Sequence, residues 1–404
     1  MISYITGTVY FFLILEILLI VKSFLYARRE RKTKRPDYAP KVAIVAPHYG
    51  WDAPTVENVR RLLNLDYAGA YEVFFVTHAQ GESGYDTSYP HLLEIAEKYP
   101  NARVSLAPNI VDNSLPRSQK VQNLMTAISA FPDDIEVVAF VDADATVQAD
   151  WLTLLVQPLQ DKQVGATVGA RFYFPHNFHT APLVEAIWIN FQIALQGDHP
   201  FSMVWGGSNA IRRELLETGK VLQRWDNAAI EDHNLTHAVR DLKLKVHFVP
   251  DCVAITHIEN RTWKQIMEFT NRQMVMTYRM GFKAQWACSL FIFLPKALIV
   301  LGSILFVFYF DRLLPVLFVP FIEIPSYRIF ALNLPCWLRD MPRMRETIRV
   351  TSLVTPISMC VAGLNALYAL FQNKIAWGGV RYEILSATKC RVLGRVGNEE
   401  KEGG

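Results

Sequence analysis

Residues 137–145 read Val137-Val138-Ala139-Phe140-Val141-Asp142-Ala143-Asp144-Ala145. Five consecutive apolar residues indicate a strand that is buried on both faces. The strand stops on two carboxylates, which need a compensating positive charge when they are buried. Carboxylate oxygens suit Mg²⁺ or Mn²⁺, so the stretch predicts a metal-diphosphate site at the carboxyl edge of a sheet. The alternative is a chance Asp-x-Asp in a turn.

Composition limits the possible classes of protein. The chain has 404 residues, of which 51% are hydrophobic, and its formal net charge is +3. This length allows one large domain or two ordinary ones, and the small net charge gives no overall basic field for nucleic acid. The five cysteines are scattered without metal-ligand spacing or a disulfide framework. They favour a reducing, cytoplasm-facing catalytic region.

The central strand belongs to a region, Lys41 to Asp251, in which strand-like and helix-like segments alternate. This order predicts an α/β fold with a mostly parallel sheet and helices on both faces. Ligands of such sheets bind outside the carboxyl ends of the strands. The other elements expected here are strands at 42–46, 72–76 and 103–107, a helix at 52–65 capped by Asp52, and a helix at 118–131 capped by Ser118.

Apolar segments at both ends of the chain predict transmembrane helices. Residues 5–25 are long enough to span a bilayer, and the basic run 28–35 follows at once, which indicates an uncleaved anchor with its basic flank in the cytoplasm. Residues 286–310 and 350–371 are further candidate spans. Residues 313–338 are broken by four prolines and form either a kinked span or a re-entrant segment.

Two questions about these segments stay open. Basic residues precede and follow residues 350–371, so both flanks favour the inside and the topology after residue 310 is undecided. Residues 181–197 form either a core helix or a helix on the membrane surface. The aromatic and basic residues of 262–282 indicate an interfacial helix.

Other polar residues are candidates for the same site. Glu231 and Asp232 follow an apolar run, and Asp232 is expected to open a helix whose dipole keeps the carboxylate ionised and able to accept a proton. The alternative is an ordinary charge at a helix N-terminus. Lys120 and Asn123 lie one helical turn apart, where they either meet phosphate and sugar or form a solvated face. The glycines of residues 205–209 allow a close backbone approach to a ligand.

The order of these elements resembles the inverting GT-A glycosyltransferases, and most closely the ceramide glucosyltransferase family. The resemblance extends over about residues 1–310. The matching stretches are Val42-Ala43-Ile44-Val45-Ala46-Pro47-His48-Tyr49-Gly50, residues 57–67 and 71–76, Lys120-Val121-Gln122-Asn123-Leu124, the DxD motif Asp142-Ala143-Asp144, and Ile230-Glu231-Asp232.

The resemblance implies a single-displacement transfer with inversion at the sugar carbon. In it, Asp144 assisted by Asp142 holds Mg²⁺ or Mn²⁺, and Asp232, beside Glu231, accepts the proton of the acceptor hydroxyl. The donor would be a nucleotide-sugar such as UDP-glucose, and the acceptor a ceramide-, diacylglycerol- or hopanoid-type lipid. The residues expected to bind the donor are Pro47, Lys120, Asn123, Asp142, Arg272 and Glu82.

The chain departs from the family pattern in two places. The first Asp of the family should lie within residues 77–82, where none is present, and Gln80 or Glu82 is the expected substitute. The Arg-x-x-Arg-Trp motif should lie at residues 272–276, where Arg272 alone remains. Two alternatives therefore stay open, a processive polysaccharide synthase and a membrane scaffold that has lost catalysis.

The expected organisation is that of an integral membrane protein with its catalytic domain facing the cytoplasm, in the inner membrane if the cell is bacterial. The membrane and a lipid acceptor are its expected partners, and nucleic acid is not. The expected parts are an anchor (1–27), a GT-A domain (28–260), an interfacial helix (261–285), a C-terminal membrane region (286–373) and a cytoplasmic tail (374–404).

Overall fold

The computed structural model describes residues 2–80, 84–199, 202–305 and 319–396. The chain divides into two compact units, each made of separate stretches of sequence. We call them the sheet unit (Thr33–Arg171, Ser202–Thr256 and Lys374–Gly404) and the helical unit (Met1–Lys32, Phe172–Phe201 and His257–Asn373). The continuous domain expected at residues 28–260 thus lacks residues 172–201, which belong to the helical unit.

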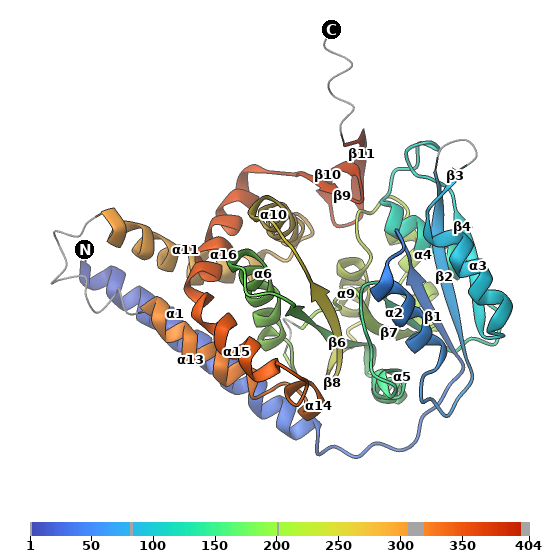
Figure 1. Ribbon diagram of the computed structural model, residues 1–404, viewed down its shortest axis with the longest axis horizontal. Coiled ribbons are helices and arrows are strands. Elements are labelled where there is room, and N and C mark those ends of the chain that lie inside the picture. The colour runs from blue at the N-terminus through green and yellow to red at the C-terminus, as the bar shows by residue number, and fades with distance from the viewer. Residues whose placement is uncertain (1, 81–83, 200–201, 306–318, 397–404) are drawn as a thin grey trace, which may run out of the picture. The chain divides into compact units, whose positions relative to one another are not determined.

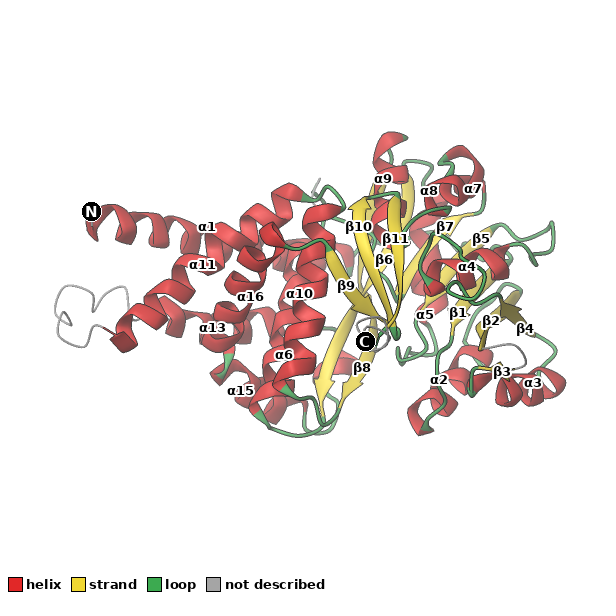
Figure 2. Ribbon diagram, turned by 90° about the horizontal axis from the view of Figure 1, so that it is seen from above, coloured by secondary structure: helices red, strands yellow, loops and turns green. Residues whose placement is uncertain are grey.

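The sheet unit is built on a mixed sheet in the order β3-β2-β1-β5-β7-β6-β8, with β4 paired to β2. Strands β4, β2, β1 and β5 run parallel, whereas β7 is antiparallel to both β5 and β6 (Figures 1 and 2). The strands are β1 (Val42–Pro47), β2 (Tyr71–Gln80), β3 (Gly84–Tyr85), β4 (Ala102–Ala107), β5 (Val137–Val141), β6 (Val164–Pro175), β7 (Ser208–Arg212) and β8 (Lys245–Ile258).

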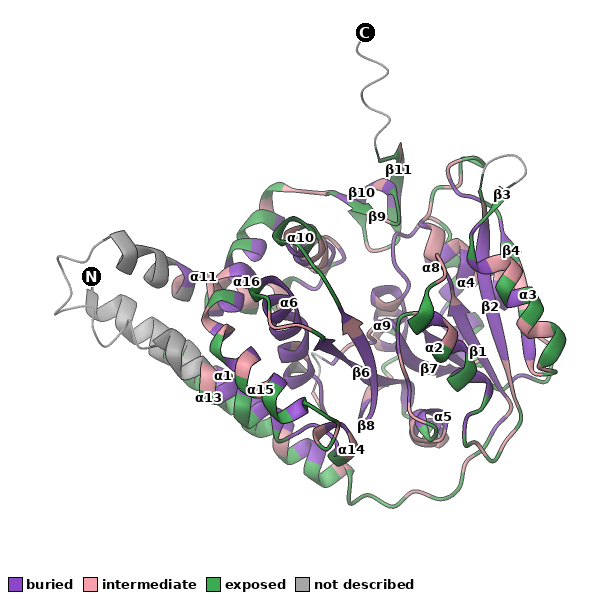
Figure 3. Ribbon diagram, in the orientation of Figure 1, coloured by how far each residue is buried: buried purple, intermediate pink, exposed green. Residues whose placement is uncertain are grey.

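Helices cover both faces of this sheet, which confirms the expected α/β fold. On one face Ile44 packs in a core with Leu62 of α2 and Leu92 of α3. On the other face Val138 packs with Leu124 of α4, and the strands between these layers are buried (Figure 3). The helices of the unit are α2 (Ala53–Leu63), α3 (Ser88–Lys98), α4 (Gln119–Ile128), α5 (Trp151–Val156), η1 (Gln157–Gln160), α7 (Glu214–Thr218), α8 (Val221–Trp225) and α9 (Asp232–Asp241).

Local signals in the sequence set these elements. Strand β5 has the bounds that its five apolar residues predict, and all five are buried. Asp52 caps α2 by accepting a hydrogen bond from the backbone N–H of Thr55, and Ser118 caps α4 in the same way through Val121. Helix α4 ends at Ile128, three residues before the expected end, because the chain turns at Ser129.

The last part of the sheet unit is an antiparallel sheet of β9 (Lys374–Trp377), β10 (Val380–Ser386) and β11 (Lys389–Arg395). Most of residues 374–404, which the sequence suggested to be a tail, thus form a sheet. The sheet is attached to the rest of the unit, because the Asn234 side chain donates to the Ala387 carbonyl at 2.8 Å and Arg395 pairs with Asp112 at 2.7 Å. Asn234 lies in the first turn of α9, so this sheet supports the start of that helix.

The helical unit packs around α16. The Trp286 Nε1–H of α11 donates to the Ala366 carbonyl at 2.9 Å, and the Asn365 and Asn271 amides bond at 2.6 Å. The described helices are α1 (Ile2–Glu30), α6 (Thr180–Asn190), η2 (Phe191–Leu195), α10 (Trp263–Arg279), α11 (Lys283–Leu305), α13 (Val319–Ala331), α14 (Cys336–Arg339), α15 (Met344–Leu353) and α16 (Thr355–Phe371).

The helices of the helical unit can be compared with the membrane segments that the sequence predicted. Ten residues of α6, from Ala181 on, are buried, which favours the core-helix alternative for this segment. The expected span 350–371 is not one helix, because the chain bends by 61° between α15 and α16. Among the described residues no single helix is long and apolar enough to cross a bilayer, although this bent pair meets the criteria together. Residues 306–318, which belong to two expected spans, lie outside the described ranges.

Two aspartates at equivalent helix starts allow a test of the caps. Asp52 accepts from the Thr55 backbone at 2.9 Å, whereas Asp150 precedes α5 without any side-chain cap bond. We expect Asp52→Ala to lower the free energy of unfolding by about 1 kcal/mol and Asp150→Ala to leave it nearly unchanged. Thermal unfolding of the two full-length variants measures the difference. Equal losses in both would contradict the assigned cap.

Candidate active site

One group of charged side chains gathers where β5 ends. Asp142 and Asp144 follow this strand directly, while Arg171 comes from β6 and Lys120 from the first turn of α4. Glu231 and Asp232 stand at the start of α9. All six residues belong to the sheet unit. The structure therefore brings together two carboxylate pairs that lie about 90 residues apart in the sequence.

Lys120 joins the two carboxylate pairs. Its Nζ lies 2.7 Å from Asp142 Oδ1 and 2.6 Å from Glu231 Oε1. Burial would lower the pKa of Lys120, but the two carboxylates outweigh that effect and raise it, so the ammonium stays charged. The sequence left two roles open for Lys120, contact with phosphate and a place on a solvated helix face. In the structure it is committed to carboxylates.

Arg171 holds the two aspartates of the DxD motif. Its Nη1 donates to Asp142 Oδ2 at 2.8 Å, and its Nη2 donates to Asp144 Oδ2 at 2.7 Å. Thr256 Oγ1 accepts from the Arg171 Nε at 3.1 Å and fixes the guanidinium plane. The sequence interpretation missed this residue. Arg171 is the single charged side chain in a strand of twelve buried residues. A buried charge needs a partner of opposite charge, so this feature of the sequence could have indicated its role.

The two aspartates of the motif differ in their surroundings. Both oxygens of Asp142 are ion-paired, and although burial would raise its pKa, Lys120 and Arg171 outweigh burial and lower the pKa. The Asp144 side chain is 61% exposed and pairs with Arg171 through one oxygen. Asp144 is thus the carboxylate that can reach a ligand outside the protein.

Glu231 is the most enclosed member of the group, with a side chain that is 4% exposed. Burial raises its pKa, and the nearby Asp232 and Asp142 raise it further, against the opposing effect of Lys120. A carboxylate so enclosed has no access to an acceptor molecule. Glu231 is therefore held by its ion pair with Lys120, and its expected catalytic role beside Asp232 stays a prediction.

Asp232 is the first residue of α9, as the sequence predicted. Its Oδ1 accepts from the His233 backbone N–H at 2.6 Å and from His233 Nδ1 at 2.8 Å, while its Oδ2 accepts from the Gly206 N–H at 2.8 Å. Burial would raise the pKa of Asp232, but His233, Lys120 and the Gly206 N–H lower it on balance. The carboxylate is ionised at neutral pH, and its Oδ2 retains capacity for a second donor.

Gly206 and Gly207, directly before β7, lie against the charged side chains of this group. Gly207 has φ of +91°, and a Cβ on it would lie 2.7 Å from Arg171 Cδ and 2.8 Å from Asp142 Oδ2. A side chain at this position would collide with the ion pair, so glycine is required. The sequence predicted that the backbone at the two glycines comes close to a ligand. In the structure this backbone lies close to the charged side chains of the site.

Further residues expected in the site lie at the carboxyl ends of β1 and β2. Pro47 ends β1, and the next exposed ring, Tyr49, stacks on His78 with ring centres 5.7 Å apart and an interplanar angle of 12°. Asp86, which the sequence interpretation overlooked, accepts from the Gly50 N–H at 2.9 Å and from Gln80 Nε2 at 3.3 Å. Asp86 therefore fixes the loop that carries Tyr49. Glu82, a proposed substitute for the missing Asp, lies outside the described residues.

Two other predicted binding residues have different surroundings. Asn123 is buried, and its Oδ1 accepts from Gln119 Nε2 at 2.9 Å, so its amide stabilises α4. Arg272 belongs to α10 of the helical unit, where its guanidinium lies 5.2 Å from the centre of the Phe269 ring. Burial lowers the pKa of Arg272 to about 10.

Comparison with known proteins identifies the family. The family model described as Glycosyl transferase family 21 matches residues 8–390. The chain belongs to glycosyl transferase family 21. This family includes ceramide glucosyltransferase, so the resemblance seen in the sequence is confirmed. The chain is thus a glycosyltransferase that transfers sugar from a nucleotide-sugar.

Two further comparisons add context. No curated protein matches this family 21 chain in sequence at a significant level. Among solved structures, it resembles "Mannosyltransferase PcManGT from Pyrobaculum calidifontis in complex with GDP-Man and Mn2+" with 19% sequence identity and a TM-score of 0.45. That match covers 89% of this chain and 99% of the other.

The Lys120 bridge can be tested by removal of its charge. Lys120→Met leaves Asp142 and Glu231 partly or wholly uncompensated, so we expect a loss of about 3 kcal/mol in the free energy of unfolding at pH 7.5. Glu231→Gln in the same chain should restore part of the loss, because one unpaired carboxylate is then gone. Denaturant unfolding of the wild type, both single variants and the double variant measures the coupling.

The pH dependence of this loss follows from the raised pKa of Glu231. Without Lys120 the pKa of Glu231 rises further, so the carboxyl is protonated more readily as the pH falls, and the cost of Lys120→Met is smaller at pH 5 than at pH 7.5. The cost is largest above the folded pKa of Glu231. A penalty that is equal at pH 5 and pH 7.5 would contradict the bridge.

Proposed function

We propose that this glycosyltransferase moves a hexose from a nucleotide-sugar of the UDP-glucose kind to a lipid hydroxyl by a single displacement with inversion. The observation that supports it best is Asp232, an ionised carboxylate with one oxygen able to accept a further hydrogen bond. A base at the start of a helix, next to a strand end with two aspartates, suits attack by a hydroxyl on an activated sugar.

Asp232 is the base of this proposal. Its Oδ1 is held by two hydrogen bonds from His233, which orient the carboxylate, and Oδ2 takes the proton of the acceptor hydroxyl as the hydroxyl oxygen attacks the sugar carbon. The C–O bond to the acceptor forms while the bond to the diphosphate oxygen breaks. The electron pair of that bond leaves with the diphosphate, and general-base assistance of this kind contributes about 10²–10⁴-fold in rate.

The residues at the strand end fit a divalent cation. The group has four carboxylates and two permanent cations, and the formal difference of two negative charges equals one Mg²⁺ or Mn²⁺. Asp144 would hold the ion, with Asp142 beside it. Such an ion neutralises charge on a departing diphosphate. Among the described residues no three acidic, His or Cys side chains form a metal cage, so water and diphosphate oxygens would complete the shell.

Arg171 and Lys120 keep this arrangement in place before the donor arrives. Arg171 spans Asp142 and Asp144 and prevents the two carboxylates from moving apart. Lys120 fixes the distance between Asp142 and Glu231, the residue before the base. Preorganised charge of this kind avoids reorganisation during the reaction.

The nucleotide end of the proposal rests on the loop after β1. The Tyr49 ring is 65% exposed, and its stacking on His78 leaves an aromatic surface beside Pro47 that suits a nucleobase. Asp86 holds this loop in the absence of the first Asp of the family. The role of Arg272 toward the diphosphate stays a prediction from the sequence.

The lipid acceptor and the membrane location are also parts of the proposal. Their support is the family, the apolar helices of the helical unit and the bent pair α15–α16, which has the length and composition of a span. A processive polysaccharide synthase is the enzymatic alternative, and its products would be longer than one transferred sugar.

The direct experiment is a screen of membranes that contain the full chain. Each of several UDP- and GDP-sugars is offered with ceramide and diacylglycerol, and the lipid products are identified by mass. We expect one hexose per lipid from a UDP-sugar. Long products would favour the synthase, and sugar transfer to water alone would remove the lipid acceptor from the proposal.

Asp232→Asn tests the base. The amide keeps the size of the side chain but cannot take a proton, so we expect transfer to fall at least 10²-fold while the affinity for the nucleotide-sugar stays within about twofold. Initial rates and equilibrium binding of the donor measure both effects. Full activity in this variant would remove Asp232 as the base.

Asp144→Ala tests the metal. We expect weaker donor binding in the presence of Mn²⁺ and no change in its absence, because an ion held by Asp144 would attract the diphosphate only when Mn²⁺ is supplied. Titrations of the donor with Mn²⁺ and with EDTA provide the comparison. Asp66→Ala, which removes an exposed carboxylate elsewhere in the sheet unit, is the control. Unchanged Mn²⁺ dependence in Asp144→Ala would exclude the assignment.

A further inference from the structure

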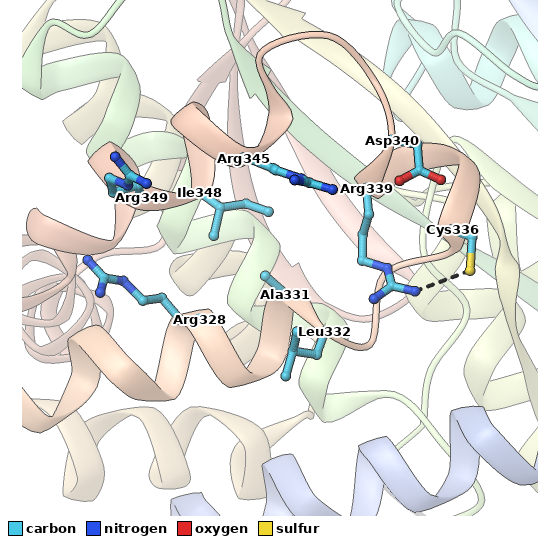
Figure 4. A pocket seen from close by; sticks show the side chains of 9 residues that line it. All are labelled: Arg328, Ala331, Leu332, Cys336, Arg339, Asp340, Arg345, Ile348 and Arg349. Atoms are coloured by element: carbon cyan, nitrogen blue, oxygen red, sulfur yellow. Dashed lines mark hydrogen bonds between the residues drawn. The ribbon is translucent and has the colours of Figure 1, made fainter.

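A pocket in the helical unit carries an unusual concentration of arginine. Its cavity has a volume of about 470 Å³, and its lining includes Arg328, Arg339, Arg345 and Arg349 (Figure 4). The same lining holds one acidic residue, Asp340, so four positive charges face one negative charge and the net charge is +3. This pocket belongs to no part of the proposed transfer site.

The arginines reach the pocket from three elements. Arg345 and Arg349 lie four residues apart on α15 and thus on one face of that helix, while Arg328 comes from α13 and Arg339 from α14 (Figure 4). Like charges placed together repel each other, so this arrangement lowers the stability of the folded chain unless an anion offsets the repulsion. Arginine also presents a planar fork that matches the oxygens of a phosphate.

The arginines are only partly engaged within the described part of the chain. Arg328 Nε donates to Ser352 Oγ at 3.0 Å, and Arg339 Nη2 donates to Cys336 Sγ at 3.1 Å. The Arg339 Nε is buried and has no hydrogen-bond partner among the described residues. The nearest acid along α15, Glu346, pairs instead with Arg343, which does not line the pocket. Donor groups are therefore left over for a bound anion.

Apolar side chains complete the pocket and continue beyond it. Leu332, Ala331 and Ile348 line it, and the Leu332 side chain is 55% exposed. Large exposed apolar residues also lie on α13, α15 and α16, namely Ile329, Leu353 and Ile357. Helix α15 is also the first half of the bent pair with span-like composition. A ligand that suits both the arginines and the apolar side chains beside them has a phosphate group joined to a hydrocarbon chain.

We propose that this arginine pocket binds the phosphate headgroup of an anionic phospholipid. The guanidinium groups of the four arginines take the phosphate oxygens, and the acyl chains lie along Leu332 and the exposed apolar side chains of Ile329, Leu353 and Ile357. Inorganic phosphate presents the same oxygens without the chains. The proposal does not depend on the proposed transfer reaction.

Thermal unfolding of the full chain in detergent micelles tests the pocket. The probes are phosphatidic acid, phosphatidylcholine with the same chains, glycerol 3-phosphate and inorganic phosphate, each at the same concentration. We expect phosphatidic acid to raise the unfolding temperature by about 2–4 °C and the other three to leave it unchanged. Arg345→Gln/Arg349→Gln should abolish the shift.

A matched control removes the same charge from another surface. Arg60→Gln/Arg61→Gln neutralises two exposed arginines on α2 of the sheet unit and should retain the full shift. Arg328→Gln, on a different helix, tests the pocket if the first double variant does not fold, and it should reduce the shift by at least half.

Three results would overturn the proposal. A full shift in Arg345→Gln/Arg349→Gln, or in Arg328→Gln where that variant is the test, would exclude the pocket. The absence of any shift with phosphatidic acid in the wild type would exclude the ligand. An equal shift with glycerol 3-phosphate or inorganic phosphate would show that free phosphate, not the lipid, is the source of the recognised group.

Discussion

The Lys120 ammonium is the contact on which the site depends. It lies between Asp142 at the end of β5 and Glu231 at the start of α9, within 2.7 Å of an oxygen of each. Two buried carboxylates from distant parts of the sequence could not approach each other without it, because each would face the other's charge in a poorly hydrated place. Lys120 thus joins the strand end that carries the proposed metal ligands to the residue before the proposed base.

Arg171 and the glycine pair extend the same network. Arg171 ties Asp144 to Asp142, and Gly207 leaves the space that its side chain needs. The remaining negative charge is the reason why a divalent cation and a diphosphate suit the site together. The proposed base, Asp232, differs from its neighbour Glu231 in its pKa, because hydrogen bonds from His233 and Gly206 favour the ionised form of Asp232, whereas burial raises the pKa of Glu231.

The sequence predicted the parts of the fold that local signals control. The apolar run of β5, the caps Asp52 and Ser118, and the position of Asp232 at a helix start all follow from residues close together in the chain. Arg171 and His233 were missed because their roles come from pairings across the sheet and around the helix start. The C-terminal strands were taken for a tail, since their alternation is short and rich in basic residues.

The anomeric configuration of the first product distinguishes one displacement at the sugar carbon from two. In the proposed mechanism Asp232 acts only as a base, so the transfer is completed in a single displacement. We expect proton NMR of the glycosylated lipid to show the configuration opposite to that of the nucleotide-sugar. Retention of the donor configuration would contradict it, because two displacements would then be needed and Asp232 could not be simply the base.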